Sequence, residues 1–386
     1  MSETDVGPAA LAAQLIRRPS VTPRDEGALA VVAETLESLG FTCHRLVFGG
    51  SGNDEIQNLY ARWGTGRPNL CFAGHTDVVP AGNPEAWSFD PFGATLQNGA
   101  LYGRGAVDMK GAIAAFIAAA QQYLDEYGAR LEGSISFLIT GDEEGDAVNG
   151  TKKVLEWLAQ RGEILDACLV GEPTSAKTLG DMIKIGRRGS LTGRLAAHGV
   201  QGHTAYPDRA DNAAHRLVAM LHALTTAKLD RGTEHFPPST LQVSTIDIGN
   251  PASNVIPASA QAVFNIRFND HWTSERLKRW IADRLDGVGG RYTLDIRVSG
   301  ESFLVPPSII GDRLAEAIRR VTGRTPEFST TGGTSDARFI QALCPVAEFG
   351  LVGLTMHQID ERVELSDLAS LTEIYRTFLG LFFDHS

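Results

Sequence analysis

Histidine and carboxylate side chains stand just after three apolar, strand-like segments of the chain. His75 follows LCFAG and Glu172 follows ACLVG, while Glu143 and Glu144 come shortly after SISFLIT. Ligands of open α/β sheets bind outside the carboxyl ends of the strands, so we expect these side chains to meet at one edge. Histidine and carboxylate ligands without thiolate are typical of zinc in a catalytic site. The pattern therefore predicts a metal-dependent enzyme.

The glycine-rich segment LYGRGAVDMKG, residues 101–111, contributes a further carboxylate. Gly103 and Gly105 resemble the start of a dinucleotide-binding loop, but the third glycine position of that motif is Asp108 here. Its carboxylate would repel a pyrophosphate, and no strand leads directly into the loop, which disfavours a nucleotide-binding oxidoreductase. We expect the glycines to let the backbone bend so that Asp108 points at the metal edge. Two alternatives stay open: Asp108 as an ordinary helix N-cap, and Glu143–Glu144 as a solvated turn.

Composition narrows the class of protein. The 386 residues are 43% hydrophobic and 21% charged, which is typical of a globular protein of two or three domains. The net charge of −11 disfavours nucleic acid and anionic membranes as partners, so an anionic substrate needs a local basic cluster. The four cysteines are scattered singly, and no signal peptide or membrane-spanning run of ~20 apolar residues is present. These features predict a cytoplasmic protein.

Helical and strand patterns alternate through the first 180 residues, which predicts an α/β fold with a mostly parallel sheet. We expect helices over 8–18, 25–39 and 111–127, and strands at FTCHRLVF, IQNLYARW, NLCFAG, SISFLIT and DACLVG.

The pattern changes near Asp181, where exposed, alternating strands begin. Two helices, over 211–227 and 274–285, lie among these strands and indicate an inserted α+β two-layer domain. The α/β pattern returns with helices over 309–322 and 365–383. We predict a discontinuous metal-binding catalytic domain, 1–180 and 297–386, and an inserted dimerisation domain, 181–296.

Several longer segments occur in an order known from one enzyme family: HTDVVPAG, LYGRGAVDMKG, TGDEEG, VGEPT, GRRGS, QGHTAYP, SNVIP, GGTSDARF and TMHQIDERV. Over about residues 10–383 the sequence resembles the dinuclear zinc deacylase and exopeptidase family, which includes acetylornithine deacetylase and aminoacylase. The resemblance implies an amide hydrolase with two Zn²⁺ per chain, for which Co²⁺ can substitute. It also implies a cis peptide bond between Asp108 and Met109.

The resemblance assigns roles to the matched positions. Asp108 is expected to bridge the two metals, with His75 and Glu172 completing one site and Glu144 and His357 completing the other. His357 is the position that depends most on the resemblance, because TMHQIDER alone reads equally as a loop with an exposed histidine.

Two further residues are expected to act on these ligands or on the attacking water. Glu143 resembles the general base and acid, which takes a proton from water and gives it to the leaving amine. Asp77 is expected to hold the His75 ring in its metal-binding tautomer.

Within the family, the segments GEPTS, IKIGRRGS, QGHTAYP and STTGGTSD are most similar to members that cleave N-succinyl-LL-2,6-diaminopimelate in lysine and diaminopimelate biosynthesis. That substrate carries several carboxylates, which guanidinium groups would bind. Strand alternation allows only one of Arg187 and Arg188 to face a given side, and we favour Arg187, then Arg267. The resemblance adds Tyr206, Asn254 and Thr334 as substrate contacts. Gly353 replaces an asparagine usual in these members.

His203 resembles the histidine that stabilises the tetrahedral oxyanion. In this family the inserted domain supplies it across a homodimer, so one chain alone would have an incomplete site; the alternative is an ordinary turn residue before Tyr206. Two other functions stay open: deacylation of another N-acyl amino acid such as N-acetylornithine, and a non-catalytic binding protein on the same fold.

Overall fold

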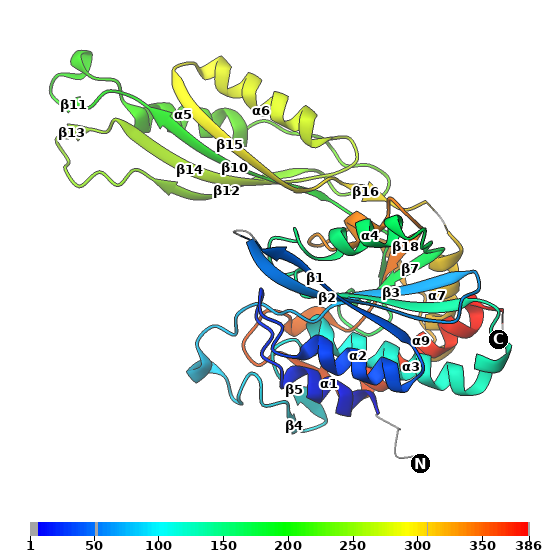
Figure 1. The fold of residues 1–386 in the computed structure, drawn as a ribbon. Helices are drawn as coiled ribbons and strands as arrows, with labels where there is room; N and C mark the ends of the chain where they lie inside the picture. The colour runs from blue at the N-terminus through cyan, green and yellow to red at the C-terminus, as the bar shows by residue number, and fades with distance from the viewer. Residues whose placement is uncertain (1–6, 51–52, 307, 385–386) are drawn as a thin grey trace. The chain divides into compact units, whose positions relative to one another are not determined.

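The computed structural model describes residues 7–50, 53–306 and 308–384, and the chain forms two compact units (Figure 1). Unit 1 comprises Met1–Ile185, Val305–Ser329 and Ser335–Ser386. Unit 2 comprises Gly186–Leu304 and Thr330–Thr334. Among the described residues, no helix combines the length and the apolar character that crossing a bilayer requires.

Unit 1 is built on an eight-stranded mixed sheet with the order β1-β2-β6-β3-β7-β18-β8-β17. Its centre is parallel, with β6 pairing β3, β3 pairing β7, and β7 pairing β18. The antiparallel pairs lie toward the edges, apart from the parallel pair of β8 and β17. This confirms the predicted mostly parallel α/β sheet. The strands are β1 (Thr42–Gly50), β2 (Asn53–Trp63), β3 (Asn69–His75), β6 (Ser134–Thr140), β7 (Ala167–Val170), β8 (Met182–Lys184), β17 (Glu327–Ser329) and β18 (Val346–Glu348).

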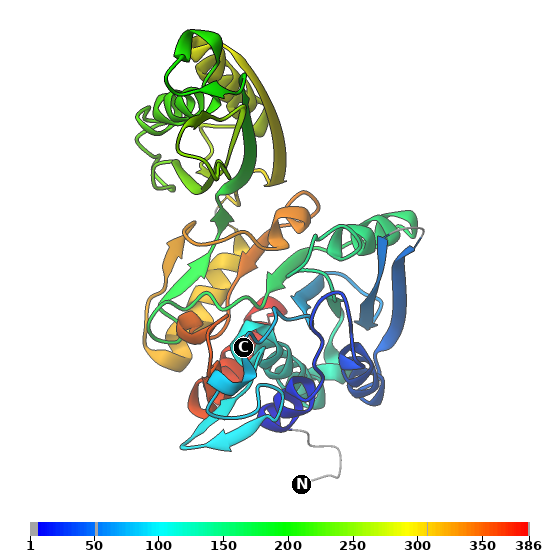
Figure 2. The ribbon, with the colours of Figure 1, turned by 90° about the vertical axis from the view of Figure 1, so that its left-hand side faces the viewer.

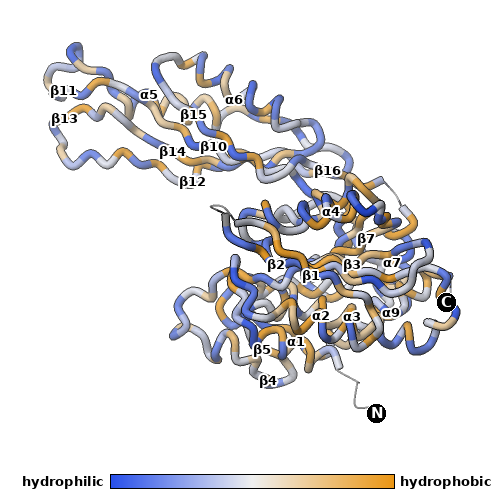
Figure 3. The backbone as a smooth tube through the Cα atoms, viewed as in Figure 1, coloured by the Kyte–Doolittle hydropathy of each residue, from blue (hydrophilic) through white to orange (hydrophobic). Residues whose placement is uncertain are grey.

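Helices cover both faces of this sheet, and β3, β6 and β7 are therefore buried along their whole length. Apolar runs of this kind are typical of parallel strands covered on both sides. Figure 3 shows hydrophobic colour on β3 and β7. In Figure 1, α1, α2, α3 and α9 lie on one face and α4 on the other. The helices are α1 (Pro8–Ile16), α2 (Ala28–Ser38), α3 (Gly111–Tyr127), α4 (Thr151–Gln160), α7 (Ile309–Thr322), α8 (Ala337–Ile340) and α9 (Leu365–Phe382).

A second, three-stranded sheet of unit 1 was not predicted. It has the order β19-β5-β4, from β19 (Arg362–Glu364), β5 (Ala100–Tyr102) and β4 (Thr95–Gln97). Each strand has only three residues, too few for alternation to be visible in the sequence. Residues 106–110 form an irregular helical turn that leads into α3, and short 3₁₀ turns lie at Pro84–Ala86, Gly128–Arg130, Pro207–Arg209 and Gly353–Thr355.

Unit 2 is a two-layer α+β body. Its antiparallel sheet has the order β12-β14-β10-β15, and Figures 1 and 2 both show α5 and α6 on one face of it. Two small strand pairs, β9 with β16 and β11 with β13, flank the sheet. The elements are β9 (Gly186–Arg187), β10 (Gly189–His198), β11 (Gly202–His203), α5 (Ala213–Thr225), β12 (Thr240–Asp247), β13 (Val255–Ile256), β14 (Ser259–Phe268), α6 (Ser274–Val288), β15 (Arg291–Gly300) and β16 (Phe303–Leu304).

The limits of unit 2 differ from the predicted 181–296 at both ends. β8 begins at Met182 but pairs with β17 and β18 of unit 1, so the chain passes into unit 2 only at Gly186. β15 continues to Gly300, because its alternating pattern keeps the strand paired with β10 beyond residue 296. The short segment Thr330–Thr334 also belongs to unit 2.

Two glycines of β10 make room for aromatic rings of β14. Gly189 pairs with Phe268 and Gly193 with Phe264. A Cβ atom at Gly193 would lie 2.3 Å from Cζ of Phe264, whose side chain is fully buried. Each ring therefore lies over the glycine of the neighbouring strand, as glycines paired with aromatic residues do in other sheets.

We predict that Gly193→Ala lowers the free energy of unfolding by about 1–3 kcal/mol, because the added methyl overpacks this contact. Urea denaturation measures the change. Gly287→Ala is the matched control, since Gly287 lies in α6 with nothing within 4 Å of a new Cβ. It should stabilise the protein by about 0.5–1 kcal/mol. Equal stability of the Gly193→Ala variant and the parent would contradict this packing argument.

Candidate metal centre

The carboxyl ends of three parallel strands bring the predicted chemistry to one edge of the unit 1 sheet. His75 ends β3 and pairs in register with Thr140, which ends β6. Ala73 pairs with Val170, which ends β7 two residues before Glu172. The side chain of His75 is only 1% exposed. The sequence-based expectation that these groups converge is met by the register of the strands.

Asp108 lies between two histidines, with one carboxylate oxygen facing each. Its Oδ1 is 3.2 Å from Nε2 of His75, and its Oδ2 is 3.3 Å from Nε2 of His357. Glu172 Oε1 lies 3.8 Å from the His75 nitrogen, and Glu144 Oε1 lies 2.8 Å from that of His357. The five residues thus form two nitrogen-and-oxygen sets that share one carboxylate.

The carboxylates at this edge lie close enough to repel one another, so a positive charge among them would be stabilising. Hydrogen bonds to Asp108 and Glu144 raise the pKa of His357 to about 10. Burial raises the pKa of Glu143 well above its usual range, and the neighbouring charge of Glu172 raises it further. Divalent cations would satisfy the same groups, and nitrogen and oxygen donors of this kind suit zinc. Two trios have all ligand atoms within 4.8 Å of one another: His75, Asp108 and Glu144, and His75, Glu143 and Glu172.

Asp77 positions three of these groups. Its backbone oxygen lies 2.9 Å from Nδ1 of His75, so the ring donates there and presents Nε2 toward Asp108. Its carboxylate accepts the backbone N–H groups of Glu143, at 3.2 Å, and Glu144, at 3.0 Å. The expected contact with the His75 ring is therefore made mainly by the Asp77 backbone, while the side chain orients the two glutamates.

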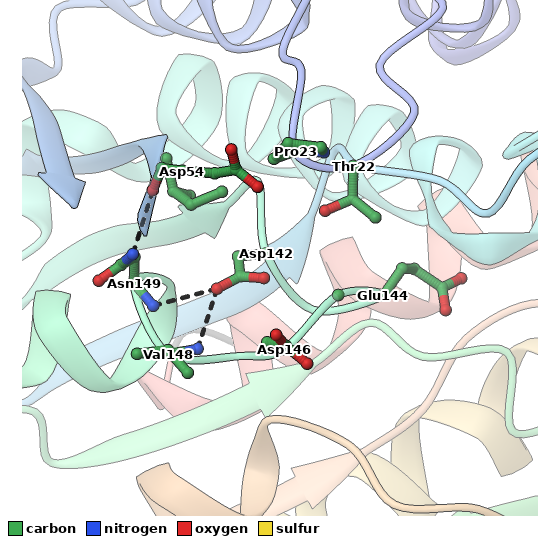
Figure 4. Close-up of a pocket in the computed structure, with 10 residues that line it drawn as sticks. Thr22, Pro23, Asp54, Asp142, Glu144, Asp146, Val148 and Asn149 are labelled. Atoms are coloured by element: carbon green, nitrogen blue, oxygen red, sulfur yellow. Dashed lines mark hydrogen bonds between the residues drawn. The ribbon is translucent and has the colours of Figure 1, made fainter. Parts of the chain in front are cut away.

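Asp142 shapes the loop that carries these glutamates, a role that sequence analysis missed. Its buried carboxylate accepts the N–H groups of Ala147, Val148 and Asn149, just before α4. Figure 4 shows the contacts of Val148 and Asn149 with Asp142 beside a cavity of about 600 Å³, with the Glu144 side chain extending away from Asp142. An aspartate that precedes a turn and a helix could have been recognised as a cap.

The segment that carries Asp108 bends as predicted. Gly105 has a left-handed φ of +84°, and a Cβ there would lie 2.7 Å from Val78. The peptide bond between Asp108 and Met109 is cis, which confirms that expectation. Asp108 is not an ordinary N-cap, because its φ of −121° and ψ of 94° lie within an irregular turn that ends before α3.

The predicted oxyanion histidine and two predicted substrate residues lie together in unit 2, around the pair β11–β13. His203 pairs with Val255, which follows Asn254, and the His203 and Tyr206 ring centroids are 5.6 Å apart. The side chains of His203, Tyr206 and Asn254 are exposed. The backbone N–H of Ala205 donates to Nδ1 of His203.

The predicted arginines and Thr334 lie around the start of β10. Arg187 is buried and donates to the carbonyl of Gly333, next to Thr334. Arg267 pairs in register with Ser190. Burial lowers the pKa of Arg267, and the nearby charge of Arg188 lowers it further. Arg188 was not favoured from the sequence, but its effect on Arg267 shows that the two guanidinium groups lie near each other.

The group around His203 and the group around Arg187 lie at opposite ends of the unit 2 sheet. Arg187 precedes β10 and His203 follows it, and β10 is ten residues long. At ~3.4 Å per residue, the strand spans about 30 Å. A small molecule cannot contact both groups of one chain.

Gly353 fits a close approach of two backbones. A Cβ at this position would lie 2.9 Å from the carbonyl oxygen of Pro173. The N–H of Gly353 donates to the carbonyl of Ser175 at 3.0 Å, which holds the approach.

Comparison with known proteins places this arrangement in a family. Two of the similar curated proteins are named succinyl-diaminopimelate desuccinylase. The one from Rhodospirillum centenum is 61% identical over 97% of both chains. The one from Methylorubrum extorquens is 56% identical over 98% of this chain and 100% of its own.

Solved structures share the fold at low identity. An M20 family metallo-carboxypeptidase from Sulfolobus solfataricus matches with a TM-score of 0.80 and 18% identity, over all of both chains. The YXEP protein of Bacillus subtilis, described as a dinuclear metal binding peptidase from the M20 family, matches with a TM-score of 0.70 and 16% identity over 98% of both chains. The model of peptidase family M20/M25/M40 matches residues 71–380. With this match and the identity to full-length relatives, the chain belongs to the peptidase family M20/M25/M40.

Proposed function

We propose that the chain hydrolyses N-succinyl-LL-2,6-diaminopimelate to succinate and LL-2,6-diaminopimelate, a step in lysine and diaminopimelate biosynthesis. The observation that carries the hydrolase chemistry is the Asp108 carboxylate, which presents one oxygen to His75 and the other to His357. Identity of 61% to a succinyl-diaminopimelate desuccinylase, over nearly the whole of both chains, supports this substrate over other N-acyl amino acids.

Two divalent cations, Zn²⁺ with Co²⁺ as a substitute, are proposed for the two ligand sets. His75, Asp108 and Glu172 would hold one cation, and His357, Asp108 and Glu144 the other. When bound, such a pair polarises the scissile carbonyl and lowers the pKa of a bound water toward ~7. Because Nδ1 of His75 donates to the Asp77 backbone, Nε2 is the nitrogen that would act as a ligand.

Glu143 is proposed as the general base and acid. Its backbone N–H is held by Asp77, and its side chain is next to those of His75 and Glu172. Burial, followed by the charge of Glu172, raises its pKa, and a raised pKa favours uptake of a proton from the attacking water. The same proton then passes to the nitrogen of the leaving amine as the amide C–N bond breaks.

Arginines of unit 2 are proposed to bind the substrate carboxylates, with Arg187 and Arg267 as the first candidates and Arg188 beside them. The mutual repulsion of Arg188 and Arg267 would be relieved by a carboxylate between them. Tyr206, Asn254 and Thr334 would add hydrogen bonds.

His203 is proposed to donate to the oxyanion that forms from the substrate carbonyl. Because Nδ1 accepts the Ala205 N–H, the neutral ring carries its proton on the exposed Nε2. That N–H is free to donate to an anion, an interaction typically worth ~3–4 kcal/mol in the transition state.

A homodimer is proposed because one small substrate cannot reach both ends of β10. Arg187 and His203 flank this ten-residue strand, so a substrate bound near the arginines of one chain needs the oxyanion donor of another. The exchange of His203 between two copies would complete both sites by the same symmetric contact.

We predict metal-dependent succinate release from N-succinyl-LL-2,6-diaminopimelate by the zinc-loaded protein. Chelation should abolish turnover, and Zn²⁺ or Co²⁺ should restore it. N-acetylornithine is the control substrate and should react far more slowly. Faster turnover of N-acetylornithine would indicate that the protein is a deacylase of another N-acyl amino acid. No turnover of either substrate would favour a non-catalytic binding protein.

Glu143→Gln should lower kcat by about 10²–10⁴-fold and keep both cations, because the isosteric amide cannot accept the proton of the water. Metal analysis beside the kinetic assay tests both parts. Glu144→Gln is the contrast: as the variant of a proposed ligand, it should lose cation content. If Glu143→Gln lost metal in step with activity, the division of roles between the two glutamates would be wrong.

Mixing inactive Glu143→Gln chains with inactive His203→Ala chains should restore activity, because one site of the mixed dimer receives both native groups. Random exchange of subunits predicts recovery to about one quarter of the parental activity. Each variant subjected alone to the same exchange is the control. No recovery after demonstrated exchange, or a fully active monomer, would exclude the transfer of His203 between chains.

A further inference from the structure

Two proposed ligands of the same cation come from segments that leave one end of a small strand pair. β5 and β19 pair antiparallel, with Tyr102 opposite Arg362. After β5 the chain continues to Asp108, and before β19 it comes from His357. The N–H of Gly103 donates to the carbonyl of Glu361 at 2.9 Å and extends the pairing by one step.

A buried ion pair joins these two segments at that end. Arg104 Nη1 lies 2.6 Å from Oε2 of Glu361, and the two side chains are 3% and 0% exposed. Arg104 is on the segment that leads to Asp108, while Glu361 is on the segment that comes from His357. Each residue therefore reaches across to the strand of the other ligand.

Glu361 holds the backbone that carries Asp108. Its second oxygen, Oε1, accepts the N–H groups of Val107 at 3.0 Å and of Asp108 at 3.2 Å. A carboxylate that accepts two successive N–H groups and also pairs with Arg104 cannot shift without breaking buried hydrogen bonds. The contact with Glu361 therefore fixes the position of the Asp108 backbone, from which the carboxylate projects.

Arg104 holds the backbone that carries His357. Its guanidinium donates to the carbonyls of Gln358 at 3.3 Å, Pro80 at 3.4 Å and His357 at 3.5 Å, and it lies over the ring of Trp87. His357 has a φ of +62°, a left-handed conformation that residues other than glycine rarely adopt. Such a conformation persists where surrounding contacts impose it, and the fork of Arg104 supplies them.

We propose that Arg104 and Glu361 are a positioning pair that sets the separation of Asp108 and His357, and so prepares the cation site formed with Glu144. The inference rests on the proposed function. Neither residue is a ligand or touches the reacting atoms. Loss of the Arg104 fork should weaken the His357 site more than the His75 site, because the fork holds the His357 backbone, whereas Asp77 holds His75 and Glu361 still holds the Asp108 backbone.

Arg104→Lys tests this role. Lysine keeps a positive charge beside Glu361, but its single ammonium cannot reproduce a planar fork directed at several carbonyls. We expect one of the two Co²⁺ dissociation constants to rise at least tenfold and the other to stay within threefold. Chelator-treated protein is titrated with Co²⁺, and binding is monitored by calorimetry and by the visible absorbance of the bound ion.

Arg62→Lys is the control, because Arg62 forms a half-buried ion pair with Glu163, at 2.5 Å, and contacts no ligand segment. Both Co²⁺ dissociation constants of the Arg62→Lys variant should equal those of the parent.

If Arg104→Lys does not fold, Arg104→Met with Glu361→Gln removes both buried charges together and is titrated instead. Unchanged constants, or an equal loss at both sites, would overturn the positioning role. A parent protein that binds fewer than two cations would instead overturn the proposed dinuclear centre itself.

Discussion

The arrangement of unit 1 depends on one constraint: several carboxylates must converge at a single sheet edge without repelling one another apart. Asp108, Glu144 and Glu172 approach two histidines there, and Glu143 lies beside them. Burial alone would favour their neutral forms, yet hydrogen bonds from both histidines hold the pKa of Asp108 below its usual range. A site that keeps negative charge under these conditions is suited to hold cations.

A second set of carboxylates near this edge accepts hydrogen bonds from backbone N–H groups. Asp77 accepts the N–H groups of both glutamates, Asp142 accepts three N–H groups of the following loop, and Glu361 accepts two at Asp108. In each case a buried acceptor fixes the main chain from which a proposed ligand or the proposed base projects. The side chains of the proposed ligands are thereby oriented without a cation, which would limit the ordering that cation binding must impose.

The parts of this site that the sequence predicts are those that follow regular elements. His75 and Glu172 come after strands whose apolar runs are unmistakable, and parallel pairing then brings their ends together. His357 and the Arg104–Glu361 pair lie outside such elements, next to three-residue strands and left-handed turns that have no periodicity. Family resemblance located His357, but nothing in the residues alone links position 104 to position 361. Likewise, the predicted border at residue 181 differs from the start of unit 2 at Gly186, because a three-residue strand gives no sign of which sheet it joins.

The division into two units also separates opposite charges. The proposed cation ligands all belong to unit 1, whereas Arg188 and Arg267 belong to unit 2. Burial lowers the pKa of both guanidinium groups, and the repulsion between them acts further on Arg267. If such arginines stood on the loops that carry the glutamates, each would pair with a carboxylate, and the capacity to bind both a cation and an anionic substrate would be lost. Because these arginines belong to a different unit, they lie outside those loops, and this separation is compatible with the proposed binding of cations by carboxylates and of an anionic substrate by arginines.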